Sequence, residues 1–365
     1  MAEPRVTVLM TVYNGMPYLA EAVESVLRQT FQDLELVVID DGSTDESPTY
    51  LAAVRDTRLR SWRHERREGQ TRSLNAGLRV ARGAYVARLD ADDIACPDRI
   101  ARQAAFLDQQ PDVAVVGSWM RAMNAAGRHT DLLRRPVTSF GMLLGWLLLG
   151  VCPLLHPSVM FRRQTILREG GYDESFHIAQ DYDLWARLAL RRSPMAVLPH
   201  CLGFYRVHEA QQSMASVRAH REEIRQIHVR WLGSLGAGSE AEAISRLLRM
   251  DEGLWDIAST KARLVSTVTA LLDLLAALPG RFRLSSQETQ DLRRLVFRWL
   301  GPGVQRTPVF KQAPDRMFYP LFFLGSPLLI PRVRRGLSRL AGHWRKTRNG
   351  LLHGARDGTL YRLDA

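Results

Sequence analysis

The sequence predicts an α/β fold, with a mainly parallel sheet that carries helices on both faces, followed by an α-helical region. Two observations predict it. Short β-branched apolar runs alternate with helical periodicity over the first 120 residues, as in a parallel sheet with crossover helices. From about residue 212 only helical periodicity continues. The composition, 46% apolar and 24% charged, is typical of globular proteins and excludes a disordered chain or a collagen.

The predicted strands and helices follow one another along the first 120 residues. Residues 5–10 and 34–39 are apolar, β-branched runs, typical of strands that are buried on both faces. Pro17 favours the start of the helix between them, because its backbone suits a first helical turn. The predicted strands are 5–10, 34–39, 59–63, 84–89 and 113–117, and the predicted helices are 18–27, 46–55, 71–81 and 97–109.

The pattern changes after the last of the sheet-like segments. Ile224, Ile227 and Trp231 recur at helical spacing, and a glycine-rich segment at 233–238 interrupts the periodicity. We therefore divide the chain into an α/β domain over residues 1–211 and a helical region over residues 212–365.

Cysteine usage and apolar segment lengths indicate the compartment. Cys96, Cys152 and Cys201 lack CxxC spacing, so we expect neither a disulfide framework nor a zinc site. This cysteine usage favours a reducing compartment. The N-terminus does not have the pattern of a signal peptide. The apolar segments at 142–155 and 317–330 are shorter than the roughly 20 residues that cross a bilayer as a helix. We expect a cytoplasmic protein.

The net charge of +12 is concentrated at one end of the chain. Residues 1–210 contain 25 basic and 25 acidic side chains, and residues 211–280 contain eight of each. Residues 281–365 contain 17 basic and five acidic side chains. The C-terminal segment is therefore the part of the chain that would bind an anionic surface. Because the sequence shows no nucleic-acid recognition motif, we do not expect that surface to be nucleic acid.

A basic amphipathic helix is predicted within residues 317–349. Val333, Leu337, Leu340 and Trp344 fall on one helical face, and Arg or Lys occupies much of the rest. One interpretation is contact with an anionic membrane surface, which would place the protein at the inner face of the membrane. The other is an ordinary helix that packs on the remainder of the protein with a solvated basic face.

Two acidic clusters follow predicted strands. Asp40 and Asp41 come after residues 34–39, and the sequence DADD at 90–93 comes after residues 84–89. Ligands of open α/β sheets bind at the carboxyl ends of the strands. In an extended segment Asp90 and Asp92 point the same way, and such carboxylates suit Mg²⁺ or Mn²⁺. The alternative for each cluster is a polar turn or a helix cap.

These clusters belong to an ordered series of motifs. The series resembles the family 2 glycosyltransferases, inverting enzymes with the nucleotide-sugar-binding GT-A fold, over about residues 4–210. The motifs are MTVYNG at 10–15, DDGSTD at 40–45, NAG at 75–77, ARGAY at 81–85, DADD at 90–93, HPS at 156–158, GYD at 171–173, QDYDLW at 180–185 and YRVH at 205–208.

The resemblance implies a donor site for a nucleotide diphosphate sugar. Thr11 and Tyr13 would line the pocket for the base and ribose. Asp41 would hydrogen-bond the base, with Asp40 supporting the loop. Arg72 would lie near the base or the diphosphate.

The resemblance also implies a metal site and a catalytic base. Asp90 would contact the ribose, and Asp92 would bind the Mn²⁺ or Mg²⁺ that bridges the diphosphate. His208 would approach the metal or the diphosphate. Asp181 would take the proton from the acceptor hydroxyl.

The expected function is the transfer of one sugar, with UDP-sugars favoured, to a saccharide or lipid-linked acceptor in bacterial surface polysaccharide or glycolipid assembly. A processive synthase is not expected, because no QxxRW-type motif or series of membrane helices is visible. The alternative from another class is a non-catalytic module that binds a sugar nucleotide or is tethered to a membrane.

One motif departs from the family pattern. The family commonly has Glu-Asp where this chain has Gln180-Asp181. Asp183 is a second candidate for the base, and Asp181 could instead serve as a charge in the first turn of a helix. His156 is interpreted as a packing residue, as are Trp119, Trp146 and Trp185.

Overall fold

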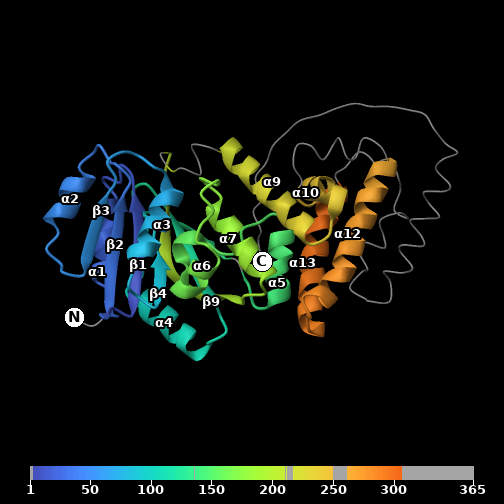
Figure 1. The fold of residues 1–365 in the computed structure, drawn as a ribbon, viewed down its shortest axis with the longest axis horizontal. Helices are drawn as coiled ribbons and strands as arrows, with labels where there is room; N and C mark the ends of the chain where they lie inside the picture. Colours follow the sequence, from blue (N-terminus) through green and yellow to red (C-terminus); the bar gives the residue numbers. More distant parts are fainter. Residues whose placement is uncertain (1–2, 135, 210, 212–216, 250–260, 306–365) are drawn as a thin grey trace.

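The computed structural model describes residues 3–134, 136–209, 211, 217–249 and 261–305 (Figure 1). Their sheet has nine strands, of which eight are ordered β3-β2-β1-β4-β8-β6-β9-β5, and β7 pairs with β6 outside this path. Helices lie around the sheet, and further helices extend beyond it on the side of α5 (Figure 1). The predicted fold class, an α/β sheet followed by a helical region, is confirmed.

The first half of the sheet is parallel, as predicted. β3 (Leu59–Arg63), β2 (Leu34–Asp40), β1 (Val6–Val12) and β4 (Tyr85–Arg88) pair in parallel. Val12 lies opposite Asp40, and Leu9 lies opposite Arg88, so β1, β2 and β4 end at the same edge of the sheet. The loops that carry both acidic clusters leave from that edge.

The second half of the sheet is mixed. β8 (Met160–Arg162) is antiparallel to β4 and to β6 (Val115–Asn124), whereas β6 is parallel to β9 (Met195–Val207). The two short strands β5 (Ile94–Ala95) and β7 (His129–Leu133) are antiparallel to β9 and β6.

Helices cover both faces of the sheet because the strands are apolar on both faces. Leu9 of β1 belongs to one hydrophobic cluster and its neighbours Val8 and Met10 to the other. The second cluster includes α1 (Leu19–Leu27), α2 (Ser47–Ala53) and α4 (Arg99–Gln109). The first includes α3 (Gln70–Val80), α6 (Arg163–Arg168) and α7 (Gln180–Leu190).

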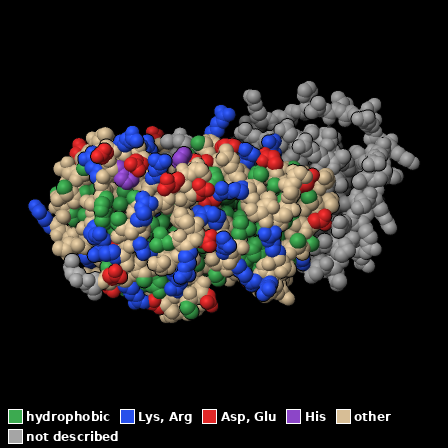
Figure 2. All heavy atoms as spheres, in the orientation of Figure 1, with side chains coloured by type: hydrophobic (Ala, Val, Ile, Leu, Met, Phe, Trp, Pro, Cys, Tyr) green, Lys and Arg blue, Asp and Glu red, His purple; other side chains and the backbone are tan. Residues whose placement is uncertain are grey.

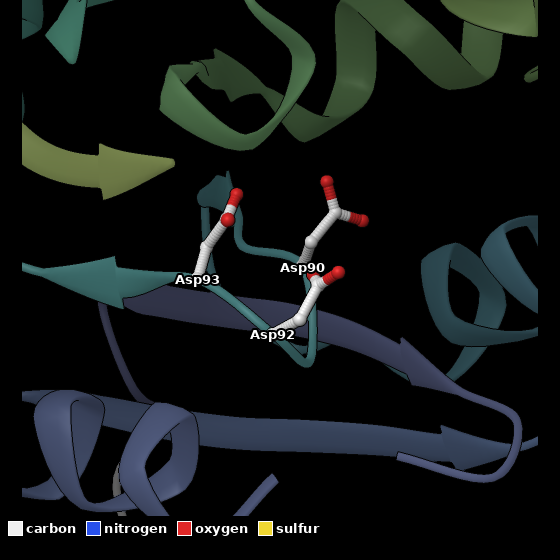
Figure 3. Close-up of side chains that lie close together, drawn as sticks. All are labelled: Asp90, Asp92 and Asp93. Carbon is white, nitrogen blue, oxygen red and sulfur yellow. The ribbon is translucent and has the colours of Figure 1, made fainter. Parts of the chain in front are cut away.

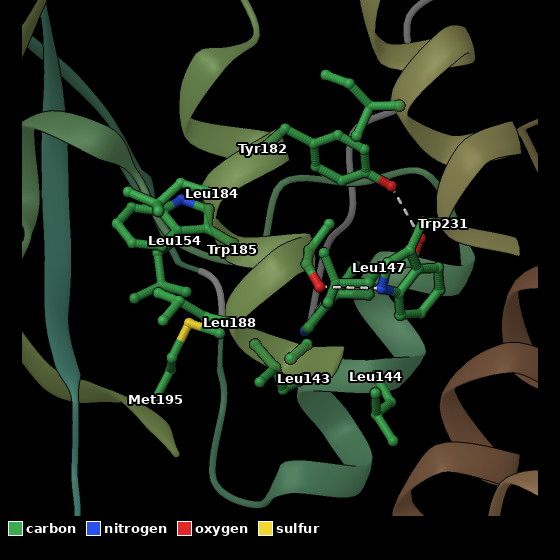
Figure 4. Close-up of a cluster of buried hydrophobic side chains, with 14 of the residues drawn as sticks. Leu143, Leu144, Leu147, Leu154, Tyr182, Leu184, Trp185, Leu188, Met195 and Trp231 are labelled. Carbon is green, nitrogen blue, oxygen red and sulfur yellow. Dashed lines mark hydrogen bonds between the residues drawn. The ribbon is translucent and has the colours of Figure 1, made fainter. Parts of the chain in front are cut away.

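The helical region shares the first cluster with the α/β part. Its described elements are α9 (Val217–Ser234), η2 (Gly238–Glu240), α10 (Ala241–Arg249), α12 (Lys261–Arg281) and α13 (Ser286–Gln305). Trp231 of α9 donates from Nε1 to the carbonyl of Ala186 on α7 at 3.1 Å, and Tyr182 of α7 donates from its hydroxyl to Leu147 at 2.9 Å (Figure 4). The predicted division at residue 211 falls between β9 and α9, but the core continues across it.

The apolar segment at 142–155 is core, as its composition allowed. It supplies most of α5 (Phe140–Leu148), whose residues Leu143, Leu144 and Leu147 are fully buried (Figure 4). Trp146 and Trp185 are buried, and Trp119 is half-buried. Among the described residues, none of the helices combines the length and apolarity needed to cross a bilayer. The segments 317–330 and 317–349 lie outside the described residues.

Candidate active site

The first part of the site is the loop after β2. Asp40 is buried, and its Oδ1 accepts the backbone N–H of Ser43 at 2.9 Å, as expected of a residue that supports the loop. Gly42 has a φ of +78°, and a Cβ there would lie 2.7 Å from the backbone of Arg66. The loop therefore packs against the segment 64–69 at a distance that only glycine permits.

Asp41 holds that segment in place. Its buried carboxylate accepts backbone N–H groups of Glu68 at 2.8 Å and of Gly69 at 2.9 Å, and the hydroxyl of Ser73 at 3.0 Å. His64 Nδ1 lies 3.2 Å from the same group. Asp41 thus fixes the chain that leads into α3, a task that the sequence did not indicate.

Thr11 and Tyr13 frame the same edge. Thr11 is buried near the end of β1, and Tyr13 is 39% exposed just beyond it. The guanidinium of Arg67 lies over the Tyr13 ring, 4.2 Å from its centre. The pair forms an aromatic and cationic surface of the kind that stacks on a planar ring.

Arg72 lies in the first turn of α3. Its Nε is 3.3 Å from the Glu174 carboxylate, and its side chain is more than half exposed. Arg72 therefore contacts the segment before α7 in this structure.

The acidic residues after β4 form a cluster. Asp90, Asp92 and Asp93 each place one carboxylate oxygen so that all three lie within 4.8 Å of one another. Their side chains point to the same side of the loop (Figure 3). Arg88, which is fully buried, pairs with Asp90.

Burial and mutual repulsion disfavour the charged forms of this cluster. Burial, and then the charge of Asp90, raise the pKa of Asp92 above the usual range. Burial, and then the charges of Asp92 and Asp90, raise the pKa of Asp93 well above it. A cation bound by the cluster would offset both effects.

Two residues at the end of β9 complete the cluster, Arg206 within the strand and His208 directly after it. His208 Nε2 lies 2.8 Å from Asp92 Oδ2, and its ring packs 5.0 Å from that of Tyr18. The buried Arg206 donates its backbone N–H to Asp93 at 2.8 Å and its Nε to the Asp92 carbonyl at 2.9 Å. The structure therefore brings His208 to the predicted metal ligand, and adds Arg206.

The residues present fit a divalent cation. The donor set is carboxylate oxygen with one imidazole, which Mg²⁺ and Mn²⁺ accept. Asp93 Oδ2 is buried and has no hydrogen-bond partner among the described residues. Asp90, Asp92 and Asp93 are the residues that could hold such an ion, with His208 beside them.

Asp181 lies in the first turn of α7 and is half-buried. Burial raises its pKa above the usual range, and this rise is opposed by the N–H of Tyr182, the thiol of Cys152 and the charge of His220. Cys152 Sγ is 3.4 Å from Asp181 Oδ2 and 3.2 Å from the carbonyl of Leu154, so two acceptors share one S–H. A carboxylate with a raised pKa is suited to accept a proton.

Asp183 has a different environment. It is fully buried and pairs with Arg187 Nε at 2.7 Å and with Arg230 of α9. Both of its oxygens are engaged in ion pairs. Asp183 therefore ties α7 to α9 and is not available as a base.

Gln70 connects the acidic cluster after β4 with the first turn of α7. Its Nε2 lies 3.5 Å from Asp90 Oδ1, and its Oε1 accepts from Gln180 Nε2 at 3.1 Å. Gln180 stands where the family commonly has Glu, and its amide supplies the donor for this contact. Burial raises the pKa of Tyr172, and the charges of Asp181 and Asp90 contribute to the rise, as expected if both lie near it.

Sequence reasoning missed several of these residues. Gln70, Arg88 and Cys152 have no motif of their own, and their roles come from contacts between distant segments. Arg206 could have been found, since it lies within the YRVH motif. His156 is buried and lies 2.9 Å from the Tyr172 hydroxyl, and burial lowers its pKa well below the usual range, as expected of a packing residue.

Comparison with known proteins agrees with the family resemblance of the sequence motifs in the N-terminal part of the chain. Residues 7–169 match the model described as Glycosyl transferase family 2. An uncharacterized glycosyltransferase of Haemophilus influenzae is 29% identical over 222 residues, which cover 58% of this chain and 68% of the relative. An uncharacterized glycosyltransferase of Methanocaldococcus jannaschii, MJ1057, is 28% identical over 222 residues, which cover 60% of this chain and 76% of the relative.

A solved structure has a similar fold over most of the chain. The crystal structure of S. aureus TarS 1-349 in complex with UDP-GlcNAc superposes with a TM-score of 0.54 at 18% sequence identity. The match covers 93% of this chain and 92% of the TarS chain. The predicted GT-A type of sheet, with helices after it, is thereby confirmed.

Proposed function

The chain belongs to the glycosyl transferase family 2 through its N-terminal part, and on that premise we propose that it is a metal-dependent, inverting glycosyltransferase. It transfers one sugar from a nucleotide diphosphate sugar to an acceptor hydroxyl. One observation carries the proposal: the Gln70 amide connects the acidic cluster at Asp90 to the turn of α7 that bears Asp181. Groups suited to a diphosphate-bound cation and a group suited to proton abstraction therefore belong to one site.

Asp181 is the general base. Inversion requires one in-line displacement at the anomeric carbon, and the acceptor hydroxyl loses its proton as the new bond forms. The raised pKa of Asp181 gives its carboxylate a higher proton affinity than an exposed aspartate has. Asp183, held by two arginines, cannot take this role.

The acidic cluster is the metal site. Asp92, with Asp90 and Asp93, would hold Mn²⁺ or Mg²⁺, and His208 lies against Asp92. Such an ion, when bound, neutralises the charge that develops on the leaving nucleoside diphosphate. Arg88 and Arg206 position the carboxylates through their contacts with Asp90 and with the loop at 92–93.

The loops after β1 and β2 are the donor pocket. Asp41 and Tyr13 contact the segment 64–69, and Thr11 lies near the end of β1 that leads to Tyr13, which supports their roles toward the base and ribose. Arg72 stands at the start of α3, within reach of this pocket. A UDP-sugar is the favoured donor, and the similar fold of TarS with bound UDP-GlcNAc supports that choice.

The acceptor is a saccharide or a lipid-linked saccharide, and the proposed role is in bacterial surface polysaccharide or glycolipid assembly. A position at the cytoplasmic face of the membrane would follow from the basic residues after position 281. The chemistry lies in residues 1–211 and the surface contact in residues 212–365.

The proposal is tested with a panel of nucleotide sugars. UDP, UDP-glucose, UDP-galactose, UDP-GlcNAc and GDP-mannose are added to the full chain with and without MnCl₂, and the unfolding temperature is followed. Binding of one donor raises that temperature, because a ligand stabilises the state that it binds. Release of the nucleoside diphosphate is then measured for the donor that binds.

Two variants separate the roles. Asp92→Ala is expected to remove the Mn²⁺-dependent part of donor binding, and Asp181→Ala to abolish release without weakening binding. Full turnover by Asp181→Ala would refute the assignment of the base. Donor binding without release in the natural sequence would favour a non-catalytic sugar-nucleotide-binding module.

A further inference from the structure

The N-cap position of the helix that carries Asp181 offers no side-chain acceptor. Ala179 stands there and has no side chain that can accept a hydrogen bond, while within the first turn Asp181 itself accepts the N–H of Tyr182 at 2.8 Å. The first N–H groups of a helix and those of the residues before it need acceptors when they are shielded from water. The N–H groups of residues 177–179 find their acceptor on another helix.

Glu223 of α9 supplies it. One oxygen of its carboxylate accepts the N–H of His177 at 3.0 Å. The other accepts the N–H of Ile178 at 2.9 Å and that of Ala179 at 2.9 Å. Three successive backbone donors therefore converge on one half-buried carboxylate, and the favourable field at a helix N-terminus adds to the interaction.

The preceding residues of the same segment are held by α3 and by α9. Asn75 bonds the backbone of Tyr172 through both its amide atoms, and Thr71 donates to the carbonyl of Phe176 at 2.6 Å. Arg230 of α9 pairs with Asp173 at 3.3 Å and lies over the Phe176 ring. The backbone of residues 172 and 176 is therefore bonded by α3, whereas the N–H groups of residues 177–179 are bonded by Glu223 of α9.

Further contacts lock α9 and α7 together along one face of α9. Arg230 pairs with Asp183, and Trp231 donates to the Ala186 carbonyl. His220, one turn before Glu223, is near enough to oppose the rise in the pKa of Asp181. α9 therefore follows α7 along its length and reaches the turn that bears the base.

We propose that Glu223 is a positioning residue for Asp181, which sets the backbone of residues 177–181 and so aims the carboxylate of the base at the acceptor. The inference rests on the proposed function and extends it to the helical region, which takes part in the reaction through this contact. Misplacement of a reacting group by about 1 Å can reduce the rate about 100-fold. The loss of this cap is expected to affect turnover more than donor binding.

The first test is hydrogen–deuterium exchange on the full chain. In Glu223→Ala, peptides that cover residues 175–184 are expected to exchange at least about tenfold faster, because three amides lose their acceptor. Glu223→Gln keeps one acceptor oxygen and should give an intermediate rate. The matched control is Glu222→Ala: Glu222 is exposed, pairs with Arg225 and should leave these peptides unchanged. Unchanged exchange in Glu223→Ala would overturn the proposal.

The second test is kinetic, with the donor that the panel identifies and water as the acceptor. Glu223→Ala is expected to lower kcat for nucleotide release by about 10- to 100-fold with the donor KM within about twofold, and Glu223→Gln to restore part of the rate. An equal loss in Glu222→Ala, or an unchanged kcat in Glu223→Ala, would count against positioning. If the natural sequence binds no donor, the proposed function fails, while the exchange experiment still decides whether Glu223 holds the turn.

Discussion

At the scale of single residues, the surroundings of a carboxylate decide its role. Asp181 and Asp183 lie two positions apart on α7, and the sequence offered both as the base. Asp183 is fully buried between Arg187 and Arg230, which occupy both of its carboxylate oxygens. Within the part of the chain that the structure describes, Asp181 pairs with no arginine, and burial raises its pKa. Asp183 is therefore suited to hold helices together, and Asp181 is suited to exchange a proton.

This difference predicts opposite outcomes for two conservative changes. Asp183→Asn should lower the free energy of unfolding by about 2 kcal/mol, less than for a fully buried pair, because both arginines are partly exposed. Asp181→Asn should leave that free energy unchanged or higher, because it removes a charge that burial disfavours, and should abolish turnover. Urea unfolding and a nucleotide-release assay check both. A stable Asp183→Asn protein would show that the ion pairs do not secure α7.

The thiol of Cys152 predicts a pH effect. It lowers the pKa of Asp181 by donating to the charged form, so Cys152→Ala should raise that pKa further. The base acts only when deprotonated. The acidic limb of the kcat/KM profile should therefore move to higher pH, with the activity lost first at the acid end of the range and retained at alkaline pH.

The control for this change is Cys201→Ala. The Cys201 thiol contacts the carbonyl of Gly203 on β9 and is not among the groups that shift the pKa of Asp181. Its pH profile should match that of the natural sequence. Identical profiles for Cys152→Ala and Cys201→Ala would remove the thiol from the account of the base.

At the scale of elements, α5 and α13 approach each other through glycine. A Cβ at Gly141 would lie 1.8 Å from the backbone oxygen of Glu288, and one at Gly145 would lie 2.9 Å from the side chain of Leu295. Backbone atoms cannot yield as a flexible side chain can. The two helices therefore need glycine at position 141 in order to pack as they do.

Gly141→Ala is expected to lower the free energy of unfolding by about 1–3 kcal/mol, the usual cost of overpacking. The matched control is Gly280→Ala in α12, where no atom of the described residues lies within 4 Å of the added Cβ and where alanine favours the helix. Thermal and urea unfolding of both proteins check the prediction. Equal stability of the two variants would mean that α13 does not pack against α5 as described.

The two buried strands that the sequence predicted share one physical property. Residues 5–10 and 34–39 are mainly apolar, β-branched runs inside the sheet, and their burial on both faces follows from that pattern. The strand predicted at 113–117 overlaps β6, which begins at Val115 and continues to Asn124. β9 was not predicted, because Pro199 and His200 interrupt its pattern, and its pairing with β6 shifts register nearby. The strand β7, with exposed residues such as His129, carries no clear periodicity.

The site was predictable where it lies in one short segment. The convergence of Asp90 and Asp92 was expected from their spacing after one strand, whereas the addition of Asp93 to the cluster comes from the structure. The pairing of His208 with Asp92 was implied only by the family resemblance. Contacts such as Gln70 with Gln180, or Glu223 with Ala179, join segments whose proximity only the fold determines.

At the scale of the whole molecule, charge and chemistry occupy different parts of the chain. On the face shown in Figure 2, acidic and basic side chains are interspersed over the described residues. This agrees with the balance of 25 basic and 25 acidic residues in the first 210. The net charge of +12 comes from residues 281–365, most of which lie outside the described residues. The net charge therefore bears on the location that we propose for the enzyme and does not bear on its reaction.

The membrane contact is tested by removing that charge in the full chain. Each basic residue near an anionic surface contributes about 1 kcal/mol, so neutralising four removes about 4 kcal/mol and should weaken binding to vesicles roughly 1000-fold. The substituted residues, each changed to Gln, are Arg332, Arg334, Arg335 and Arg339. The matched control changes four exposed arginines of the remainder of the chain to Gln: Arg28, Arg102, Arg191 and Arg218. Co-sedimentation with phosphatidylglycerol-containing vesicles at low and high salt measures both. If the two variants bind equally, the basic segment does not anchor the enzyme, and its predicted helix is better explained by packing on the protein.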